Sequence, residues 1–180
     1  MAASSGATPL TGASTIGAVT VVDFRIRPMT AADARTVAAW RYPGEYSFYV
    51  ADADAGDLAE LLNPAEWGHR YFAADEVPPR ELAGFVAVKL SNRVAELGLG
   101  LRPGLTGRGL GEAYVGTCLR FAATTLGAQG YTLAVAAFNQ RAITVYERAG
   151  FRKIERYEHF TNGGLHAFIR IARGPIDSPH

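Results

Sequence analysis

The chain of 180 residues is 48% apolar and 11% aromatic, which is enough for one globular domain with a sizeable core. Its formal net charge of +1 argues against general nucleic-acid binding, because that function needs a basic patch or stripe. No apolar run reaches membrane-spanning length, the single cysteine excludes an intramolecular disulfide, and the four histidines lack metal-ligand spacing, so we expect a cytoplasmic protein without a metal or a membrane partner.

The two ends of the chain differ from its middle. Residues 1–20 are rich in Ala, Ser, Thr and Gly, without the positive n-region or the continuous apolar h-region of a signal peptide. We interpret them as a flexible N-terminal leader. The domain itself is expected over residues 21–173, with a polar C-terminal tail over residues 174–180.

The first part of the domain contains strand and helix signals in alternation. Alternating apolar residues predict strands over residues 21–27, 71–74, 81–89 and 96–101. Thr30 can cap a helix over residues 31–40, and a second short helix is possible over residues 57–62. The strands would form an antiparallel meander whose last two members join through a hairpin at residues 91–93.

Aromatic and acidic side chains are concentrated between residues 40 and 60. Residues 40–49 hold five aromatic side chains around a Pro-Gly turn, and we expect irregular structure there. These aromatics either cover the core or line a substrate pocket, because they contribute large buried area in both places. The acids Asp52, Asp54, Asp57 and Glu60 usually form a solvated face, but at the mouth of a pocket they would attract a cationic substrate.

Residues 96–111, E-L-G-L-G-L-R-P-G-L-T-G-R-G-L-G, carry the strongest functional signal. Alternation leaves Gly98 and Gly100 bare on one strand face beside Glu96, which suggests a ligand lying there. A glycine loop and a helix start follow, so free N–H groups, the positive end of a helix dipole and Arg108 could bind a phosphate or pyrophosphate. Neither the P-loop pattern nor the dinucleotide pattern G-x-G-x-x-G fits this loop.

Two helices and three strands are expected after the loop. The helices cover residues 110–126 and 139–150, and the strands cover residues 131–138, 151–160 and 165–173. Cys118 lies in the apolar stripe of the first helix, so core packing explains it better than a role as nucleophile. Asn162 and Gly163 mark a tight hairpin between the last two strands.

Two motifs in this part of the chain resemble those of the GNAT acetyltransferases. The glycine loop is similar to motif A, [QR]-x-x-G-x-[GA], with Gly109 and Gly111 at the small positions but Thr106 where the family has Gln or Arg. Residues 139–151 match motif B, N-x-x-A-x-x-x-Y-x-x-x-G-F, at every marked position. The motifs occur in the family's order, and the resemblance covers residues 24–173.

The resemblance implies an α/β (α+β) fold with a central mixed, mostly antiparallel sheet of six to seven strands, flanked by about four helices. It implies an N-acetyltransferase, an acyltransferase that moves the acetyl group of acetyl-CoA to a primary amine of a small molecule or peptide by direct attack in a ternary complex. The cofactor-binding residues that it implies are Leu99, Gly100, Leu101, Thr106, Gly107, Arg108, Gly109, Leu110, Gly111, Asn139 and Tyr146. In this family the segment after the first helix lines the acceptor side, which favours a substrate-facing role for Trp40, Tyr42, Tyr46 and Tyr49.

Acetyl transfer also needs a proton donor and a base. Tyr146 is expected to protonate the leaving thiol, and a backbone N–H near Leu101 to stabilise the oxyanion. Glu96 or a water relay is expected to deprotonate the amine, although Glu96 is equally well explained as an exposed or structural carboxylate. Relatives that acetylate ribosomal-protein N-termini often have a Glu at the position of Ala134, so that base is missing here.

Two other functions stay open. A protein N-terminal or lysine acetyltransferase would need an open peptide groove, and Ala134 weakens that reading. A non-catalytic acyl-CoA sensor would bind the cofactor without turnover. Exposed strands near the C-terminus could also pair between subunits, which makes a homodimer possible.

Overall fold

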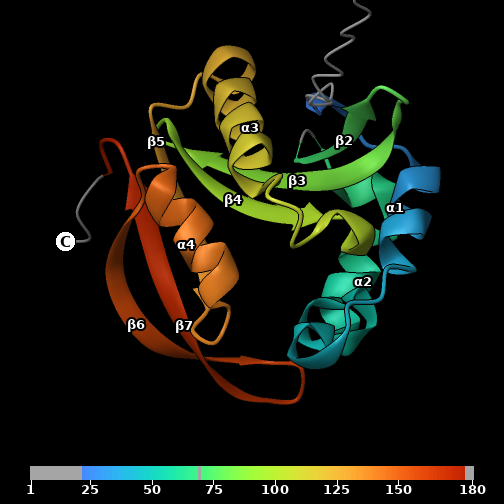
Figure 1. The fold of residues 1–180 in the computed structure, drawn as a ribbon. Coiled ribbons are helices and arrows are strands. Elements are labelled where there is room, and N and C mark those ends of the chain that lie inside the picture. The colour runs from blue at the N-terminus through green and yellow to red at the C-terminus, as the bar shows by residue number, and fades with distance from the viewer. Residues whose placement is uncertain (1–21, 69, 177–180) are drawn as a thin grey trace, which may run out of the picture.

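The fold is organised around a seven-stranded sheet with the strand order β1-β2-β3-β4-β5-β7-β6 (Figure 1). The computed structural model describes residues 22–68 and 70–176, so the expected leader and the last four residues of the expected tail lie outside the described residues. Neighbouring strands are antiparallel except β4 and β5, which run parallel. The strands are β1 (Asp23–Pro28), β2 (Tyr71–Val77), β3 (Glu81–Ser91), β4 (Val94–Leu101), β5 (Gly130–Ala136), β6 (Arg152–Thr161) and β7 (Gly164–Arg173).

Helices cover both faces of the sheet. The α-helices of the described residues are α1 (Ala31–Ala38), α2 (Ala55–Leu61), α3 (Gly111–Leu126) and α4 (Gln140–Arg148). Short 3-10 helices are η1 (Gly44–Tyr49), η2 (Ala51–Ala53), η3 (Pro64–Glu66) and η4 (Pro103–Leu105). None of the helices in residues 22–68 and 70–176 is long and apolar enough to cross a membrane.

The alternation of side chains along the strands divides the core in two. Phe72 and Val86 belong to the large cluster under α3 and α4, whereas their neighbours Tyr71 and Phe85 pack with the smaller cluster of α1 and α2. Since successive side chains of a strand point to opposite faces, the two clusters lie on opposite sides of the sheet. Trp40 is buried in the smaller cluster, with 8% of its surface exposed.

The strands β4 and β5 pair over only part of their length. Their register runs from Val94 opposite Gly130 to Glu96 opposite Thr132 and then stops. β4 continues to Leu101 beside β3, and β5 continues to Ala136 beside β7. The middle of the sheet therefore opens into a gap in which one edge of each strand has no partner strand.

An ion-pair cluster fixes α1 to the edge of the sheet. Arg27 on β1 contacts Asp75 on β2 at 2.8 Å and Asp33 in the first turn of α1 at 2.6 Å. The hydrogen bond from Arg27 lowers the pKa of Asp33 to about 2. Asp75 is 3% exposed, and its pairing with Arg27 lets β2 continue to Val77, beyond the strand over residues 71–74 that we predicted.

Most predicted elements are confirmed, and with them the mixed sheet flanked by four α-helices. One prediction was incomplete: residues 40–49, expected to be irregular, include the 3-10 helix η1. Thr30 caps α1 as expected, through a capping box with Asp33. Cys118 is fully buried on α3, in agreement with a packing role.

Candidate functional site

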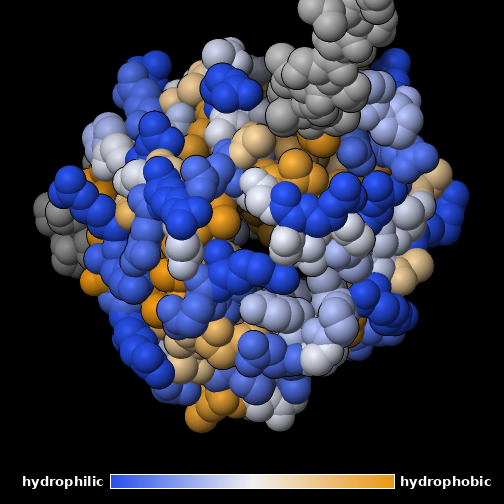
Figure 2. All heavy atoms as spheres, viewed as in Figure 1, coloured by the Kyte–Doolittle hydropathy of each residue, from blue (hydrophilic) through white to orange (hydrophobic). Residues whose placement is uncertain are grey.

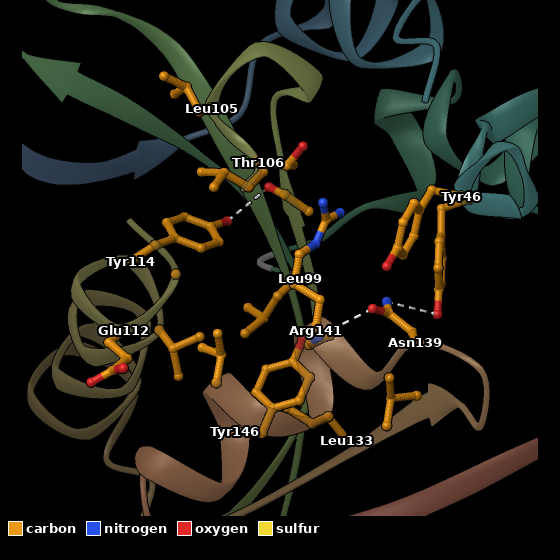
Figure 3. Close-up of a pocket in the computed structure, with 18 of the residues that line it drawn as sticks. Tyr46, Leu99, Leu105, Thr106, Glu112, Tyr114, Leu133, Asn139, Arg141 and Tyr146 are labelled. Carbon is orange, nitrogen blue, oxygen red and sulfur yellow. Dashed lines mark hydrogen bonds between the residues drawn. The ribbon is translucent and has the colours of Figure 1, made fainter. Parts of the chain in front are cut away.

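A cavity of about 490 Å³ lies where β4 and β5 separate, between the loop before α3 and the start of α4 (Figure 3). The space-filling view shows the same face hollowed near its centre (Figure 2). The cavity brings together most of the predicted cofactor residues: Leu99, Gly100, Leu101, Thr106, Gly107, Gly109, Gly111, Asn139 and Tyr146. Arg108 is exposed, Leu110 packs against the core, and neither lines the cavity, so their assignment stays a prediction.

The glycine loop presents backbone to this cavity. Gly107 and Gly109 have φ angles of +74° and +77°, a left-handed conformation that other residues rarely adopt. A Cβ atom on Gly109 would meet no atom within 4 Å, so the loop surface is open there. The N-cap of α3, Leu110, makes no side-chain capping bond, which leaves the first N–H groups of the helix without a side-chain partner. This arrangement suits an anion such as a pyrophosphate.

Gly111 serves the packing of the two helices beside the cavity. A Cβ atom there would lie 2.9 Å from Cγ2 of Val145 on α4. A larger residue would push α3 and α4 apart and widen the cavity. The small residue expected at this position therefore has a packing role in addition to any role in binding.

Tyr146 enters the cavity from α4, with its hydroxyl turned toward Leu99 (Figure 3). Burial raises the pKa of this phenol well above its ordinary value, with smaller contributions from Tyr49 and Cys118. Among the described residues, none accepts a hydrogen bond from the Tyr146 hydroxyl. It is therefore protonated near neutral pH and free to donate to a ligand.

Two other tyrosines hold the end of β4. The Tyr114 hydroxyl donates to the Phe85 carbonyl at 2.6 Å and lies 3.0 Å from the Gly100 carbonyl. The Tyr42 hydroxyl donates to the Leu101 carbonyl at 2.9 Å. Burial raises the pKa of Tyr42 to about 12, so this hydroxyl also stays protonated.

The two glycines of β4 differ in what lies beside them. A Cβ atom on Gly100 would lie 2.0 Å from the Phe85 ring, and one on Gly98 would lie 3.3 Å from the Ala87 Cβ atom. The Phe85 ring therefore fills the place of the missing Gly100 side chain, whereas Gly98 lines both cavities, so a ligand beside this strand stays a prediction. The backbone of Gly100 still lines the cavity.

Asn139 begins α4 and connects it to η1. Its side-chain oxygen accepts the N–H of Ala142 at 3.1 Å, and its Nδ2 donates to the Tyr49 hydroxyl at 3.1 Å. It is 8% exposed. The expected N-cap is thus confirmed, while a contact to the cofactor stays a prediction.

A second cavity, of about 760 Å³, lies on the α1 and α2 side of the sheet. Glu96 and Trp40 line it, together with Tyr42 and Tyr49, whereas Tyr46 lines only the first cavity. β6 and β7 also contribute to this second cavity, through Tyr157, His159, Phe168 and Arg170, which were not predicted from the sequence. The residues that line both cavities are Tyr42, Tyr49, Phe85, Leu97, Gly98, Leu99 and Ala134.

Three of the four acids noted in the sequence reach the second cavity. Asp54, Asp57 and Glu60 line it, whereas Asp52 pairs with Arg41 at 2.9 Å outside it. Burial and then the charges of Asp54 and Glu60 raise the pKa of Asp57. A cationic group in this cavity would relieve that repulsion. No group of His, Cys, Asp and Glu residues in residues 22–68 and 70–176 could hold a metal ion.

Two arginines of α4 line the first cavity and were not identified from the sequence. Arg148 pairs with Glu112 at 3.0 Å. The guanidinium carbon of Arg141 lies 4.2 Å from the centre of the Tyr46 ring, a cation–π contact. Both arginines occupy unspecified positions of motif B, so the motif pattern could not single them out.

Comparisons with known proteins agree with this geometry. Residues 23–152 match the family model of the acetyltransferase (GNAT) domain. No curated protein matches the chain. Among solved structures, the spermidine N-acetyltransferase of Vibrio cholerae in complex with CoA and spermine is similar with a TM-score of 0.68 and 21% identity, over 84% of this chain and 95% of that one. A GNAT-family acetyltransferase of Bacillus anthracis is similar with a TM-score of 0.67 and 14% identity, over the same shares of the two chains.

The structural likeness at these identities concerns the fold. The family model, however, covers most of the chain and includes both the glycine loop and the whole of motif B. The chain therefore belongs to the GNAT acetyltransferase family, whose members are acyltransferases that use acetyl-CoA as the donor.

Proposed function

We propose that the protein transfers the acetyl group of acetyl-CoA to a primary amine of a small cationic molecule or a peptide. The observation that carries this proposal is the meeting of two cavities at the gap between β4 and β5. The first cavity, which we call the donor cavity, has N–H groups that suit a pyrophosphate. The second cavity, which we call the acceptor cavity, has carboxylates that suit an ammonium group. A donor and an acceptor bound there would meet directly, as a ternary complex requires.

The solved neighbours support a cationic acceptor. One of them, the Vibrio cholerae spermidine N-acetyltransferase, is bound to CoA and spermine. In this chain Asp57 has no ion-pair partner within the described residues, whereas Glu60 contacts Arg70 at 3.4 Å. Asp54 is engaged as the cap of α2, where its Oδ1 accepts from the Gly56 N–H at 2.8 Å, so Asp57 is the carboxylate we assign to the cation.

Proton transfer is assigned to two residues of the site. Bound acetyl-CoA would supply an acetyl thioester that an amine can attack. Glu96 lines the acceptor cavity and would take the proton from the ammonium group, directly or through water. Tyr146 would give its proton to the sulfur as the carbon–sulfur bond breaks, and a backbone N–H near Leu101 would stabilise negative charge on the carbonyl oxygen.

The test is thiol release from acetyl-CoA over a panel of polyamines, amino acids, aminoglycosides and N-terminal peptides. We expect release with at least one cationic amine, and Asp57→Asn should raise its KM about three- to tenfold, because a partly exposed charge pair is worth on the order of 1 kcal/mol. Asp52→Asn is the matched control, since Asp52 lies outside the cavity and should leave KM unchanged.

The other functions predict different results. CoA binding without thiol release on any amine would favour the acyl-CoA sensor. Release with N-terminal peptides alone would favour the protein acetyltransferase. The cytoplasmic location and the possible homodimer also belong to this proposal, and sedimentation of the purified chain tests the latter.

A further inference from the structure

Arg141 lines the first cavity, which we propose binds the acetyl donor, and it lies beside η1, whose residue Tyr49 lines both cavities. It is the second residue of α4, and it extends from this helix toward the glycine loop. One terminal nitrogen, Nη1, lies 3.8 Å from the position that a Cβ atom on Gly107 would take. The guanidinium also faces Tyr46 at 4.2 Å (Figure 3). A single side chain thus lies beside the loop before α3 and contacts the helix η1.

The N–H groups of Arg141 are available to a ligand. Within the described residues, no carboxylate pairs with Arg141 and no acceptor is in hydrogen-bond range of it, whereas Arg148 is bound to Glu112. The ring of Tyr46 occupies only a face of the guanidinium, and the N–H groups of a guanidinium point outward in its plane. That geometry matches the paired oxygens of a phosphate.

The two ends of η1 are held differently. Phe48 packs 4.9 Å from the His166 ring and its carbonyl accepts a hydrogen bond from Asn162, whereas Tyr46 packs on Phe138 and Arg141. None of its residues is buried. Its aromatic side chains rest against Phe138, with ring-centre distances of 6.3 Å for Tyr46 and 5.4 Å for Phe48. Tyr49, at its end, lines both cavities and binds Asn139. Small changes in how η1 is held would therefore alter the acceptor cavity.

We propose that Arg141 binds the pyrophosphate of the cofactor and, through Tyr46, holds η1 over the acceptor cavity, so that cofactor binding prepares the acceptor site. This inference rests on the proposed use of the first cavity by acetyl-CoA. Charge on the phosphate fixes the guanidinium, and the fixed guanidinium holds the Tyr46 ring. Because such coupling is reciprocal, an ordered η1 also strengthens cofactor binding.

The first experiment compares binding of CoA and of pantetheine, which lacks the phosphates. Arg141→Gln should weaken CoA binding about tenfold, as expected for lost charge-assisted hydrogen bonds, and change pantetheine binding less than about twofold. Tyr46→Leu should weaken CoA binding about threefold, and the double variant should be no weaker than Arg141→Gln. Arg120→Gln, on the exposed side of α3, is the matched control for the lost charge.

The second experiment measures amide hydrogen exchange over residues 44–50, with and without CoA. In the wild type, saturating CoA should slow exchange there, and Arg141→Gln at its own saturating CoA should abolish the slowing. Tyr46→Phe, which keeps the ring, should retain it. Equal CoA binding by the wild type and Arg141→Gln, or equal slowing in both, would overturn the inference. Absence of CoA binding by the wild type would instead overturn the proposed function.

Discussion

Two tyrosines that line the first cavity, the buried Tyr114 and the partly buried Tyr146, differ in what their hydroxyls do. The Tyr114 hydroxyl donates to the carbonyls of Phe85 and Gly100, and these hydrogen bonds stabilise the end of β4. Tyr146 has no such partner within the described residues, and its hydroxyl faces the cavity. The sequence identified Tyr146 through motif B, but nothing in the local pattern around Tyr114 distinguishes a structural phenol from a catalytic one.

The first prediction at this scale concerns Tyr146→Phe. If the phenol protonates the leaving thiol, this change should lower kcat about 10²-fold, the range expected for general acid catalysis. CoA binding should stay within about twofold of the wild type, because the ring and its burial remain. Thiol release and CoA titration measure the two effects.

The pH profile gives an independent check of the same residue. Because burial raises the pKa of Tyr146, the phenol stays protonated between pH 6 and 9 and adds no falling limb to kcat/KM in that range. The profile should rise as the acceptor amine loses its proton. A falling limb that disappears in Tyr146→Phe, or turnover of that variant within about threefold of the wild type, would contradict the assignment.

At the scale of elements, the sequence predicted what depends on local patterns. The stripe of α3, the cap and end of α4 and the Asn-Gly hairpin were all identifiable, because their signals lie within a few residues. The gap between β4 and β5 could not be predicted, because it depends on where two strands that are distant in sequence stop pairing. The contact of Arg141 with Tyr46 could not be predicted either, nor could the side chains that β6 and β7 contribute to the second cavity, because both depend on residues far apart in sequence.

The pairing of β3 with β4 gives Gly100 a packing role that the sequence did not indicate. Gly100 is opposite Phe85 in the sheet, and the ring lies over the place of its missing side chain. Phe85 in turn lines both cavities. The glycine therefore allows the Phe85 ring to lie across β4 and form part of the wall that the two cavities share.

This packing predicts a large difference between two alanine substitutions. Gly100→Ala should destabilise the fold by about 1–3 kcal/mol or more, because the new methyl group collides with the ring of Phe85. Gly98→Ala is the matched control and should cost less, since its Cβ atom would meet only Ala87 at 3.3 Å. Adding Phe85→Leu to Gly100→Ala should restore part of the lost stability, because the smaller side chain leaves room for the new methyl group. Equal denaturation midpoints for the two alanine variants would refute this account.

At the scale of the whole molecule, an early and a late part of the chain meet beside the second cavity. The β6–β7 hairpin curves beneath α4 to reach η1 and α2 (Figure 1). Asn162 donates from Nδ2 to the Phe48 carbonyl at 2.9 Å, and the Thr161 hydroxyl lies 3.4 Å from Asp54. These few polar contacts join segments more than 100 positions apart in sequence.

The last prediction tests these contacts with Asn162→Gly. Asn162 has a φ of +51°, which glycine adopts without strain, so the change removes the hydrogen bond to Phe48 while keeping the turn. Loss of one hydrogen bond, worth about 1 kcal/mol, should raise the KM of the acceptor about three- to tenfold and leave CoA binding unchanged. Asn92→Gly is the matched control, because Asn92 has a φ of +47° in the turn between β3 and β4 and lines neither cavity. If both variants have the same KM, the hairpin does not close the acceptor site, and the second cavity is open to larger amines.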